Sequence, residues 1–242
     1  MHLLSLLLIL LLTPPTHANE KKPGVVFVVG GAGAIMNLAS PIKWSLRQVN
    51  NPLQVREFDW SHGTGRIVRD IQDTRHLIQK ADELVQQIID YQATHPEQPV
   101  YLVGKSTGAM IVLMAAEKLP IASLERIILL SPAVSPGYDL RPALRTTRLE
   151  IVSFHSPLDI PVLNWGTSIV GTADRYYSPG AGLHGFTVPD IKAADNLDYQ
   201  RLKQIEWSPS KAWYGHLGGH MGNGMPLFIL YEVMPFLDGK QK

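Results

Sequence analysis

The chain has 242 residues, of which 45% are hydrophobic and 18% are charged, and its net charge is +1. These values exclude a disordered chain, and the small net charge gives no reason to expect a nucleic acid or an anionic membrane as partner. The absence of cysteine excludes disulfides, thiolate catalysis and cysteine-ligated zinc.

The first eighteen residues differ in composition from the rest. Residues 3–12 are almost wholly apolar, and Thr16-His17-Ala18 resembles a small-residue cleavage site. Ten apolar residues are too few to cross a bilayer as a helix, but they suit the core of a secretory signal. We therefore expect a cleaved signal peptide over 1–18, with an uncleaved anchor as the alternative. A single domain over 19–242, secreted or periplasmic and without a membrane span, would follow.

The first strand of this domain is predicted over 24–29. Its β-branched residues show no alternation, which is typical of a central parallel strand covered on both faces. It runs into the glycine-rich loop 30–34, whose main-chain N–H groups are able to face a ligand. A dinucleotide fingerprint would need a third glycine where Met36 stands, so we do not favour that interpretation.

A second strand is predicted over 53–58, and apolar residues at helical spacing predict a helix over 70–91. We expect His62, before this helix, and His76, within it, at the surface or in an interface. The next apolar run ends at Val103, and a helix is predicted over 109–118.

Between that strand and helix lies Gly104-Lys105-Ser106-Thr107-Gly108. A chain that turns from a strand into a helix within so few residues crowds its own backbone. Glycines two residues either side of Ser106 remove the side chains that would clash, so the serine hydroxyl can be held exposed in a strained turn. The pattern predicts a nucleophile elbow. A phosphate loop is excluded because Pro99 occupies its first glycine position.

Further strands are predicted over 124–130, 149–154 and 202–207, and a closing helix over 226–237. Too few residues separate the first two of these strands for a large lid, which leaves 166–198 as the only candidate for a small flap. Alternating strands and helices predict a mostly parallel sheet with helices on both faces. The loops that follow the strands should then meet at one edge, where ligands bind.

Three residues expected at that edge suit nucleophilic catalysis. A serine hydroxyl needs a base to take its proton, and the base needs a carboxylate to fix its tautomer. Asp159 follows a predicted strand, and His220 lies before the last helix. With Ser106 they give the order nucleophile, acid, base that α/β-hydrolases use.

With these motifs the chain resembles the α/β-hydrolase family, in its lipase and esterase branch, over most of its length after residue 23. The resemblance implies an α/β-hydrolase fold whose lid is short or absent. It also implies an oxyanion hole made by the amides of Thr107 and Ala32, with Gly31 as the next choice. The chain departs from the family pattern at Gly30 and Lys105, where histidines are common.

Alternatives remain for the acid and the base. Asp139 follows the preceding strand and could replace Asp159, which we favour for its place at a strand end. His216 could replace His220, which lies nearer the closing helix. Two histidines four residues apart could also bind zinc on a helix, but the surrounding glycines do not favour one and no H-E-x-x-H glutamate is present. We expect His155 and His184 to be structural or to line a pocket.

The predicted function is hydrolysis of a small-molecule carboxylic ester through an acyl-enzyme on Ser106, without a metal or other cofactor. A thioesterase, amidase or acyltransferase with the same three residues is one alternative. A non-catalytic binding protein of the same fold is the other, because fold alone does not establish activity. The sequence gives no indication of the oligomeric state.

Overall fold

The computed structural model describes residues 23–160, 162–163, 167, 171–190 and 194–238. Six strands form one sheet in the order β2-β1-β3-β4-β5-β6, and every neighbouring pair is parallel. The predicted α/β-hydrolase architecture is confirmed. The strands are β1 (Val25–Val29), β2 (Gln54–Phe58), β3 (Val100–Lys105), β4 (Arg126–Leu130), β5 (Ile151–His155) and β6 (Leu202–Glu206).

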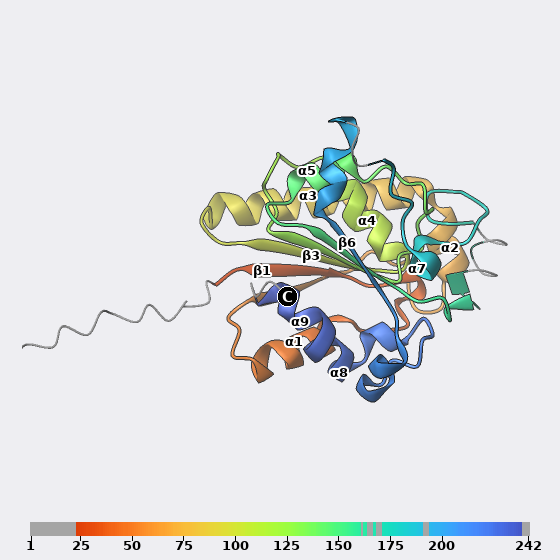
Figure 1. The fold of residues 1–242 in the computed structure, drawn as a ribbon. Coiled ribbons are helices and arrows are strands. Elements are labelled where there is room, and N and C mark those ends of the chain that lie inside the picture. Colours follow the sequence, from red (N-terminus) through yellow and green to blue (C-terminus); the bar gives the residue numbers. More distant parts are fainter. Residues whose placement is uncertain (1–22, 161, 164–166, 168–170, 191–193, 239–242) are drawn as a thin grey trace, which may run out of the picture.

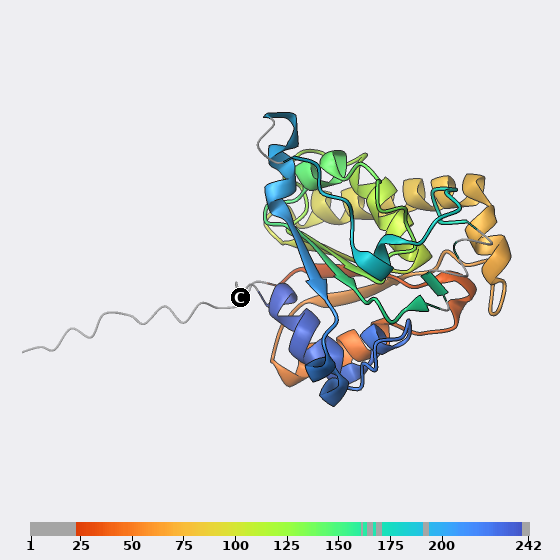
Figure 2. The same cartoon turned by 45° about the vertical axis from the view of Figure 1, so that its right-hand side comes forward.

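Helices cover both faces of the sheet, and the two layers are seen in both ribbon views (Figures 1 and 2). One face carries α3 (Thr74–Thr94), α4 (Thr107–Ala116) and α5 (Arg141–Thr146). The other face carries α1 (Ala39–Gln48), α8 (Pro226–Phe228) and α9 (Met234–Leu237). The covered sheet explains why the central strands are mostly apolar: β1, β3, β4 and β5 are buried at every position, and the charged exceptions are Lys105 at the end of β3 and Arg126 at the start of β4.

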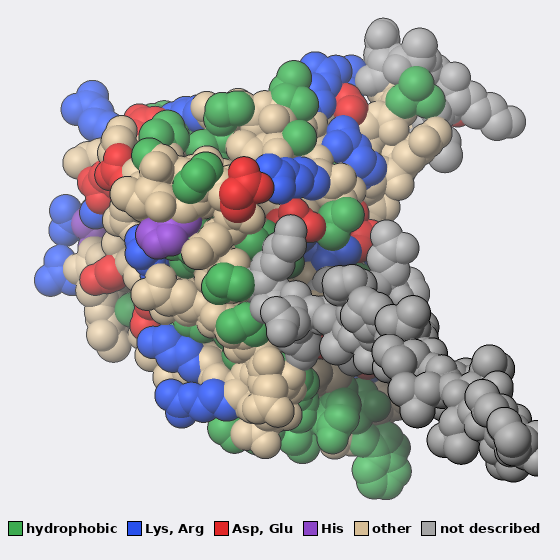
Figure 3. Space-filling view, turned by 90° about the vertical axis from the view of Figure 1, so that its left-hand side faces the viewer, with side chains coloured by type: hydrophobic (Ala, Val, Ile, Leu, Met, Phe, Trp, Pro, Cys, Tyr) green, Lys and Arg blue, Asp and Glu red, His purple; other side chains and the backbone are tan. Residues whose placement is uncertain are grey.

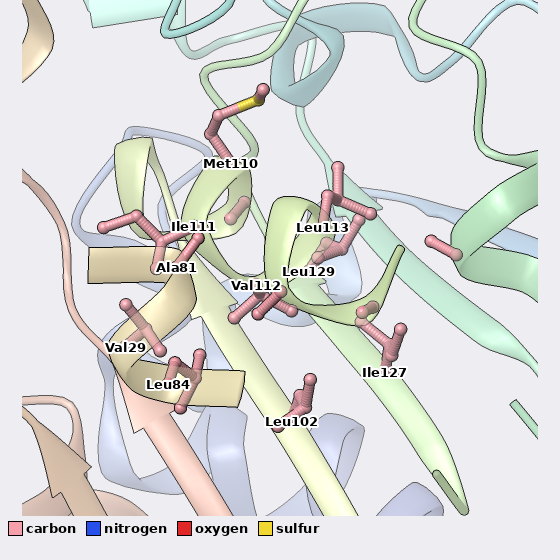
Figure 4. Packing of buried hydrophobic residues seen from close by; sticks show 14 of the residues in the cluster. Val29, Ala81, Leu84, Leu102, Met110, Ile111, Val112, Leu113, Ile127 and Leu129 are labelled. Carbon is pink, nitrogen blue, oxygen red and sulfur yellow. The ribbon is translucent and has the colours of Figure 1, made fainter. Parts of the chain in front are cut away.

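Helix α4 is the most deeply buried helix of the first layer. Nine of its ten residues are buried, so it shows no polar face. Figure 4 shows Val112 and Leu113 of this helix packed over Leu102 and Leu129 of the sheet, with Leu84 of α3 beside them. Each fully buried aliphatic side chain of this kind contributes about 1.5–3 kcal/mol. This packing fixes the start of α4, where Ser106 lies.

The helix predicted over 70–91 is corrected in the structure. A short helix, α2 (Ile67–Gln72), precedes α3, and the chain breaks between them at Asp73, whose side chain accepts a hydrogen bond from the amide of His76. The break is a helix cap, which the apolar spacing alone did not reveal. The closing helix also differs, because a π-helical segment, Ile229–Val233, joins α8 to α9.

The segment between β5 and β6 contains α7 (Ala181–His184) and the 3₁₀ helix Ala194–Arg201. Part of the expected flap over 166–198 falls outside the described residues, as does the whole of the expected signal peptide over 1–18. Within the described residues, none of the helices combines the length and the apolar composition that crossing a membrane requires.

The two ends of the sheet differ. The face at the amino ends of the strands, seen in Figure 3, carries Lys, Arg, Asp and Glu side chains interspersed with one another. The carboxyl ends point toward α2 and α7 (Figure 1). The loops after β1, β3, β5 and β6 therefore leave the sheet on one side, and the candidate site lies there.

Candidate active site

Ser106 occupies the sharp turn between β3 and α4. Its backbone has φ 53° and ψ −124°, a conformation that residues other than glycine seldom adopt. Two residues on, Gly108 lies against the end of β1, and a Cβ there would overlap the carbonyl oxygen of Gly30 and lie 2.6 Å from that of Val29. Glycine is thus required at 108 because two backbones meet there. The strained turn is the geometry of a nucleophile elbow.

The predicted acid and base are in direct contact. His220 Nδ1 lies 2.7 Å from Asp159 Oδ2, and Asp159 is fully buried just beyond the end of β5. Burial lowers the pKa of His220, and the positive charge of Lys105 lowers it further, while the hydrogen bond to Asp159 acts in the opposite direction. The imidazole is therefore neutral near pH 7, which is the form that accepts a proton.

Ser106 and His220 line the same cavity, which has a volume of about 320 Å³. Thr107, Gly31 and Ala32 border it next to the serine. The remaining wall is mostly apolar, with side chains from the loop after β1, from α2 and from the segments after β5 and β6. These are Ile35, Met36, Ile67, Ile71, Val162 and Met221.

The predicted oxyanion donors lie around the serine. Thr107 is the first residue of α4, where an amide N–H has no acceptor within the helix. Gly31 approaches so closely that a Cβ on it would lie 3.3 Å from the Cβ of Ser106. By contrast, the amide of Gly33 donates to Asp70 Oδ2 at 2.7 Å and is not directed to the cavity. These positions suit the amides of Thr107 and of Ala32 or Gly31 as donors.

Asp70 is a site residue that sequence reasoning missed. It is fully buried, and besides Gly33 it accepts hydrogen bonds from the Ser61 hydroxyl (2.6 Å) and the His62 amide (2.8 Å), and its Oδ1 lies 2.8 Å from His62 Nδ1. Burial acts to raise the pKa of Asp70, but the hydrogen bonds from His62, Ser61 and Gly33 outweigh it and the pKa is lowered. The apolar spacing of 70–91 made Asp70 resemble an ordinary first-turn helix residue, and nothing in the sequence pairs it with Gly33.

His62 is more buried than we expected. Its side chain is only 12% exposed, and its ring packs against that of His76 at a tilt of 33°, with the centroids 4.0 Å apart. The His76 ring in turn hydrogen-bonds the carbonyl of Trp60, whose indole donates to the Gly30 carbonyl at 2.8 Å. Both histidines therefore support the loop after β1.

The alternative base and acid lie elsewhere. His216 is buried away from the cavity, where its Nδ1 accepts from the Gly218 amide and its ring packs edge-on against Phe228. Burial lowers the pKa of His216 to about 4. Asp139 is exposed and pairs with Arg141 at the surface.

The zinc interpretation finds no support in the geometry. The two histidines lie in a loop between the 3₁₀ helices Pro209–Tyr214 and Gly222–Gly224, and each has a different partner. No three acidic or histidine side chains of the described residues are grouped as metal ligands would be. Of the other late histidines, His155 faces Glu206 at 3.6 Å and His184 ends α7, and neither lines the cavity.

Comparison with known proteins identifies the family. Residues 21–161 match the sequence model of a hydrolase family described as "Serine aminopeptidase, S33". The match covers more than half of the chain, so the chain belongs to this family of α/β-hydrolases. No curated protein sequence matches it.

Solved structures resemble the chain at low identity. A Thermus thermophilus protein designated TT1662 is 12% identical over 90% of this chain and 89% of its own, with a TM-score of 0.52. A poly(3-hydroxybutyrate) depolymerase from Bordetella parapertussis is 14% identical over 88% and 80%, with a TM-score of 0.49. A Trichoderma reesei cutinase is 18% identical over 55% and 63%, with a TM-score of 0.42, so the alignment spans less than two thirds of that enzyme. These likenesses concern the fold, and the family match makes the chain a hydrolase.

Proposed function

We propose that this chain is a serine hydrolase that cleaves a carboxylic ester through an acyl-enzyme on Ser106. The observation that carries the proposal is the hydrogen bond between His220 and the buried Asp159 in the wall of the cavity that holds Ser106. A buried carboxylate that fixes the histidine tautomer beside a strained serine has the parts of a nucleophile–base–acid set. The contact with the His220 ring is made by Asp159 Oδ2. Within the described structure the carboxylate accepts no hydrogen bond from any other side chain, so it is free to serve the histidine alone.

In the first half of the reaction His220 Nε2 removes the proton from Ser106 Oγ as the oxygen bonds to the ester carbonyl carbon. The carbonyl electron pair moves to the oxygen, and the amides of Thr107 and Ala32 stabilise that oxyanion by about 3 kcal/mol each. When the oxyanion collapses, the bond to the alcohol oxygen breaks and His220 gives its proton to the leaving alcohol. Water then repeats the sequence on the acyl-enzyme and releases the acid and Ser106.

The apolar lining of the cavity favours a substrate that is an ester of an uncharged, apolar acid. A serine aminopeptidase, the activity in the family's description, must bind the positive α-ammonium of a peptide. No Asp or Glu lines the cavity among the described residues, whereas eight apolar side chains do. Placing a cation there without a partner would be costly. An acyl chain gains about 0.8 kcal/mol for each buried CH₂.

Fluorophosphonate labelling followed by peptide mass spectrometry tests the nucleophile. We expect an adduct on Ser106, no adduct in Ser106→Ala, and weak labelling in His220→Ala. No adduct on the wild type between mildly acidic and alkaline pH would overturn the proposal in favour of a non-catalytic binding protein.

A substrate series tests the acyl donor. We expect p-nitrophenyl esters of neutral acyl chains to be cleaved with higher kcat/KM than the matching thioesters, anilides and aminoacyl anilides. A preference for the anilides would make the protein an amidase, and a preference for thioesters a thioesterase. Transfer to an added alcohol in place of water would identify an acyltransferase.

We also propose that the mature domain starts near Asn19 after removal of 1–18, and that it is secreted or periplasmic. The apolar run over 3–12 supports this proposal. Amino-terminal sequencing of the protein expressed with its own leader tests it. An intact Met1 in the purified protein would favour an uncleaved anchor.

A further inference from the structure

Lys105 is a buried lysine directly before the nucleophile, and the mechanism above does not use it. It is the last residue of β3 and is only 2% exposed. Its Nζ donates to the backbone carbonyl of His220 at 2.6 Å and to Asn223 Oδ1 at 2.7 Å. Within the described structure it forms no ion pair with a carboxylate, which is uncommon for a buried ammonium group. A group kept in the interior at this cost calls for a physical explanation.

The loop that carries His220 is held by side-chain donors at alternate carbonyls. Trp207 Nε1 donates to the carbonyl of His216 at 2.7 Å, and Ser156 Oγ donates to that of Gly218 at 2.6 Å. Lys105 provides the donor to His220 itself. Of these three donors only Lys105 can carry a charge, and only Lys105 comes from β3, the strand that leads directly into Ser106.

The second acceptor of Lys105 extends this support to the neighbouring strand. Asn223 Nδ2 donates to the Ser131 hydroxyl at 2.6 Å, and Ser131 directly follows β4. The loop of the base is therefore connected to the ends of β3 and β4 at positions 220 and 223. A shift of about 1 Å in a positioned catalytic group can cost a hundredfold in rate, so this support bears on activity.

The charges around His220 come from two elements. Asp159, after β5, hydrogen-bonds its ring, and Lys105, on β3, faces it with positive charge. Lys105 itself also faces Asp159 and His216. Burial lowers the pKa of Lys105 to about 8, with Asp159 opposing the shift, so the amine is mainly protonated at pH 7. Its charge lowers the pKa of His220 and so disfavours the imidazolium.

We propose that Lys105 is a positioning residue that fastens the loop of His220 to the nucleophile strand and keeps the His220 ring unprotonated in mild acid. The proposal rests on the proposed function of Ser106 and His220. Lys105 does not act as the base, because its Nζ already donates to two acceptors that belong to the histidine loop. It acts through His220, and the expected result is an enzyme that keeps its activity below the ordinary titration range of histidine.

Histidine NMR tests the proposal whether or not the enzyme turns over an ester. We would follow the ring of His220, assigned with His220→Gln, against pH in the wild type, Lys105→Met and Lys105→Gln. Both substitutions remove the charge, and we expect His220 to titrate at higher pH in each. Lys105→Gln keeps a polar group near the loop, so its effect on kcat should be smaller. The acid limb of kcat/KM should move with the NMR titration, while KM changes little.

Lys211→Met is the matched control. Lys211 is also buried and also donates to a backbone carbonyl, that of Glu206 at 2.6 Å, but it does not line the cavity. We expect this variant to lose stability without moving the His220 titration. If Lys105→Met left the His220 titration and kcat no more altered than Lys211→Met does, the proposal would be wrong.

A measurement on the wild type alone also tests the proposal, and it does not depend on whether any variant folds. As Lys105 loses its charge near pH 8, the His220 ring signal should show a second small step. Its absence would also contradict the proposal. A wild type that hydrolyses no ester and takes no fluorophosphonate, yet shows the step, would overturn the proposed function and leave the electrostatic role of Lys105 intact.

Discussion

The side chain of Asp70 accepts a hydrogen bond of 2.7 Å from the backbone amide of Gly33, thirty-seven residues earlier in the chain. Gly33 has φ 74° and follows Ala32, a candidate oxyanion donor. A buried carboxylate from α2 thus holds the turn that follows the two candidate oxyanion donors, Gly31 and Ala32. The loop after β1 and the loop of His220 are held in the same way. In each, a buried charged side chain, Asp70 or Lys105, hydrogen-bonds a backbone group.

Asp70→Asn tests this relationship. Asparagine keeps one acceptor oxygen, and its NH2 group would face either the Gly33 amide and the Ser61 hydroxyl or the His62 amide. In both orientations a buried backbone donor is left unpaired, at a cost of about 1–3 kcal/mol. We expect kcat to fall on the order of tenfold to a hundredfold through loss of a preorganised oxyanion donor, with KM little changed. Steady-state kinetics and thermal unfolding measure both effects.

Asp73→Asn is the control for that experiment, because Asp73 caps α3 through the His76 amide and also faces His62 Nε2 at 3.4 Å, but does not accept from the Gly33 amide. It should change stability and leave kcat near the wild-type value. An equal loss of kcat in the two variants would mean that α2 and α3, and not the Gly33 contact, are responsible.

Substituting His220 and His216 in turn identifies which of the two histidines acts as the base. We expect His220→Gln to lose on the order of a thousandfold or more in kcat, as removal of one member of such a set does. His216→Gln should retain kcat per folded molecule, because its ring contacts Phe228 and the Gly218 amide outside the cavity. Activity normalised to the folded fraction of each variant, measured by circular dichroism, separates loss of chemistry from loss of folding. The opposite pattern would exchange the two assignments.

The stability of the protein should depend on pH through His216. Burial lowers its pKa in the folded state to about 4, against 6.5 for the free side chain. Between these values the unfolded chain binds a proton that the folded chain does not, so the free energy of unfolding rises with pH across this window. It falls as pH drops below about 6.5.

Denaturant unfolding from pH 4 to 7 measures this slope in the wild type and in His216→Gln. We expect a shallower slope in the variant. His184→Gln replaces an exposed histidine at the end of α7 and should leave the slope unchanged. If all three proteins gave the same slope, protonation of His216 would not contribute to unfolding in acid.

The sequence predicted the parallel sheet because the strands have a simple signature. A strand buried on both faces is mostly apolar, and β1, β3, β4 and β5 are buried at every position with polar residues only at a few of them. The positions of Ser106 and Asp159 followed from the same logic, since both lie just beyond strand ends, whereas His220 was favoured for its place before the closing helix. Their roles stay predictions until activity is measured.

What the sequence did not predict are long-range polar contacts. Asp70 with Gly33 and Lys105 with His220 join residues 37 and 115 positions apart, and neither pair has a spacing pattern. The break at Asp73 was missed for a related reason, because a side-chain cap interrupts a helix without disturbing its apolar period. Hydrophobic periodicity reports which face is buried, and it does not report which polar groups meet in the interior.

Gly108→Ala tests the close approach behind the elbow. Alanine is favoured over glycine within a helix by about 1 kcal/mol, so propensity alone predicts a gain in stability. The added Cβ would overlap the carbonyl of Gly30, and forcing apart a packed contact costs about 1–3 kcal/mol. Because two backbones and no flexible side chain meet here, we expect a net loss of stability and displacement of Ser106. The midpoint temperature of thermal unfolding and the rate of fluorophosphonate labelling should both fall.

Gly137→Ala is the matched control, since a Cβ there meets nothing within 4 Å. A Gly108→Ala protein as stable and as reactive as Gly137→Ala would show that the strained serine does not depend on this contact.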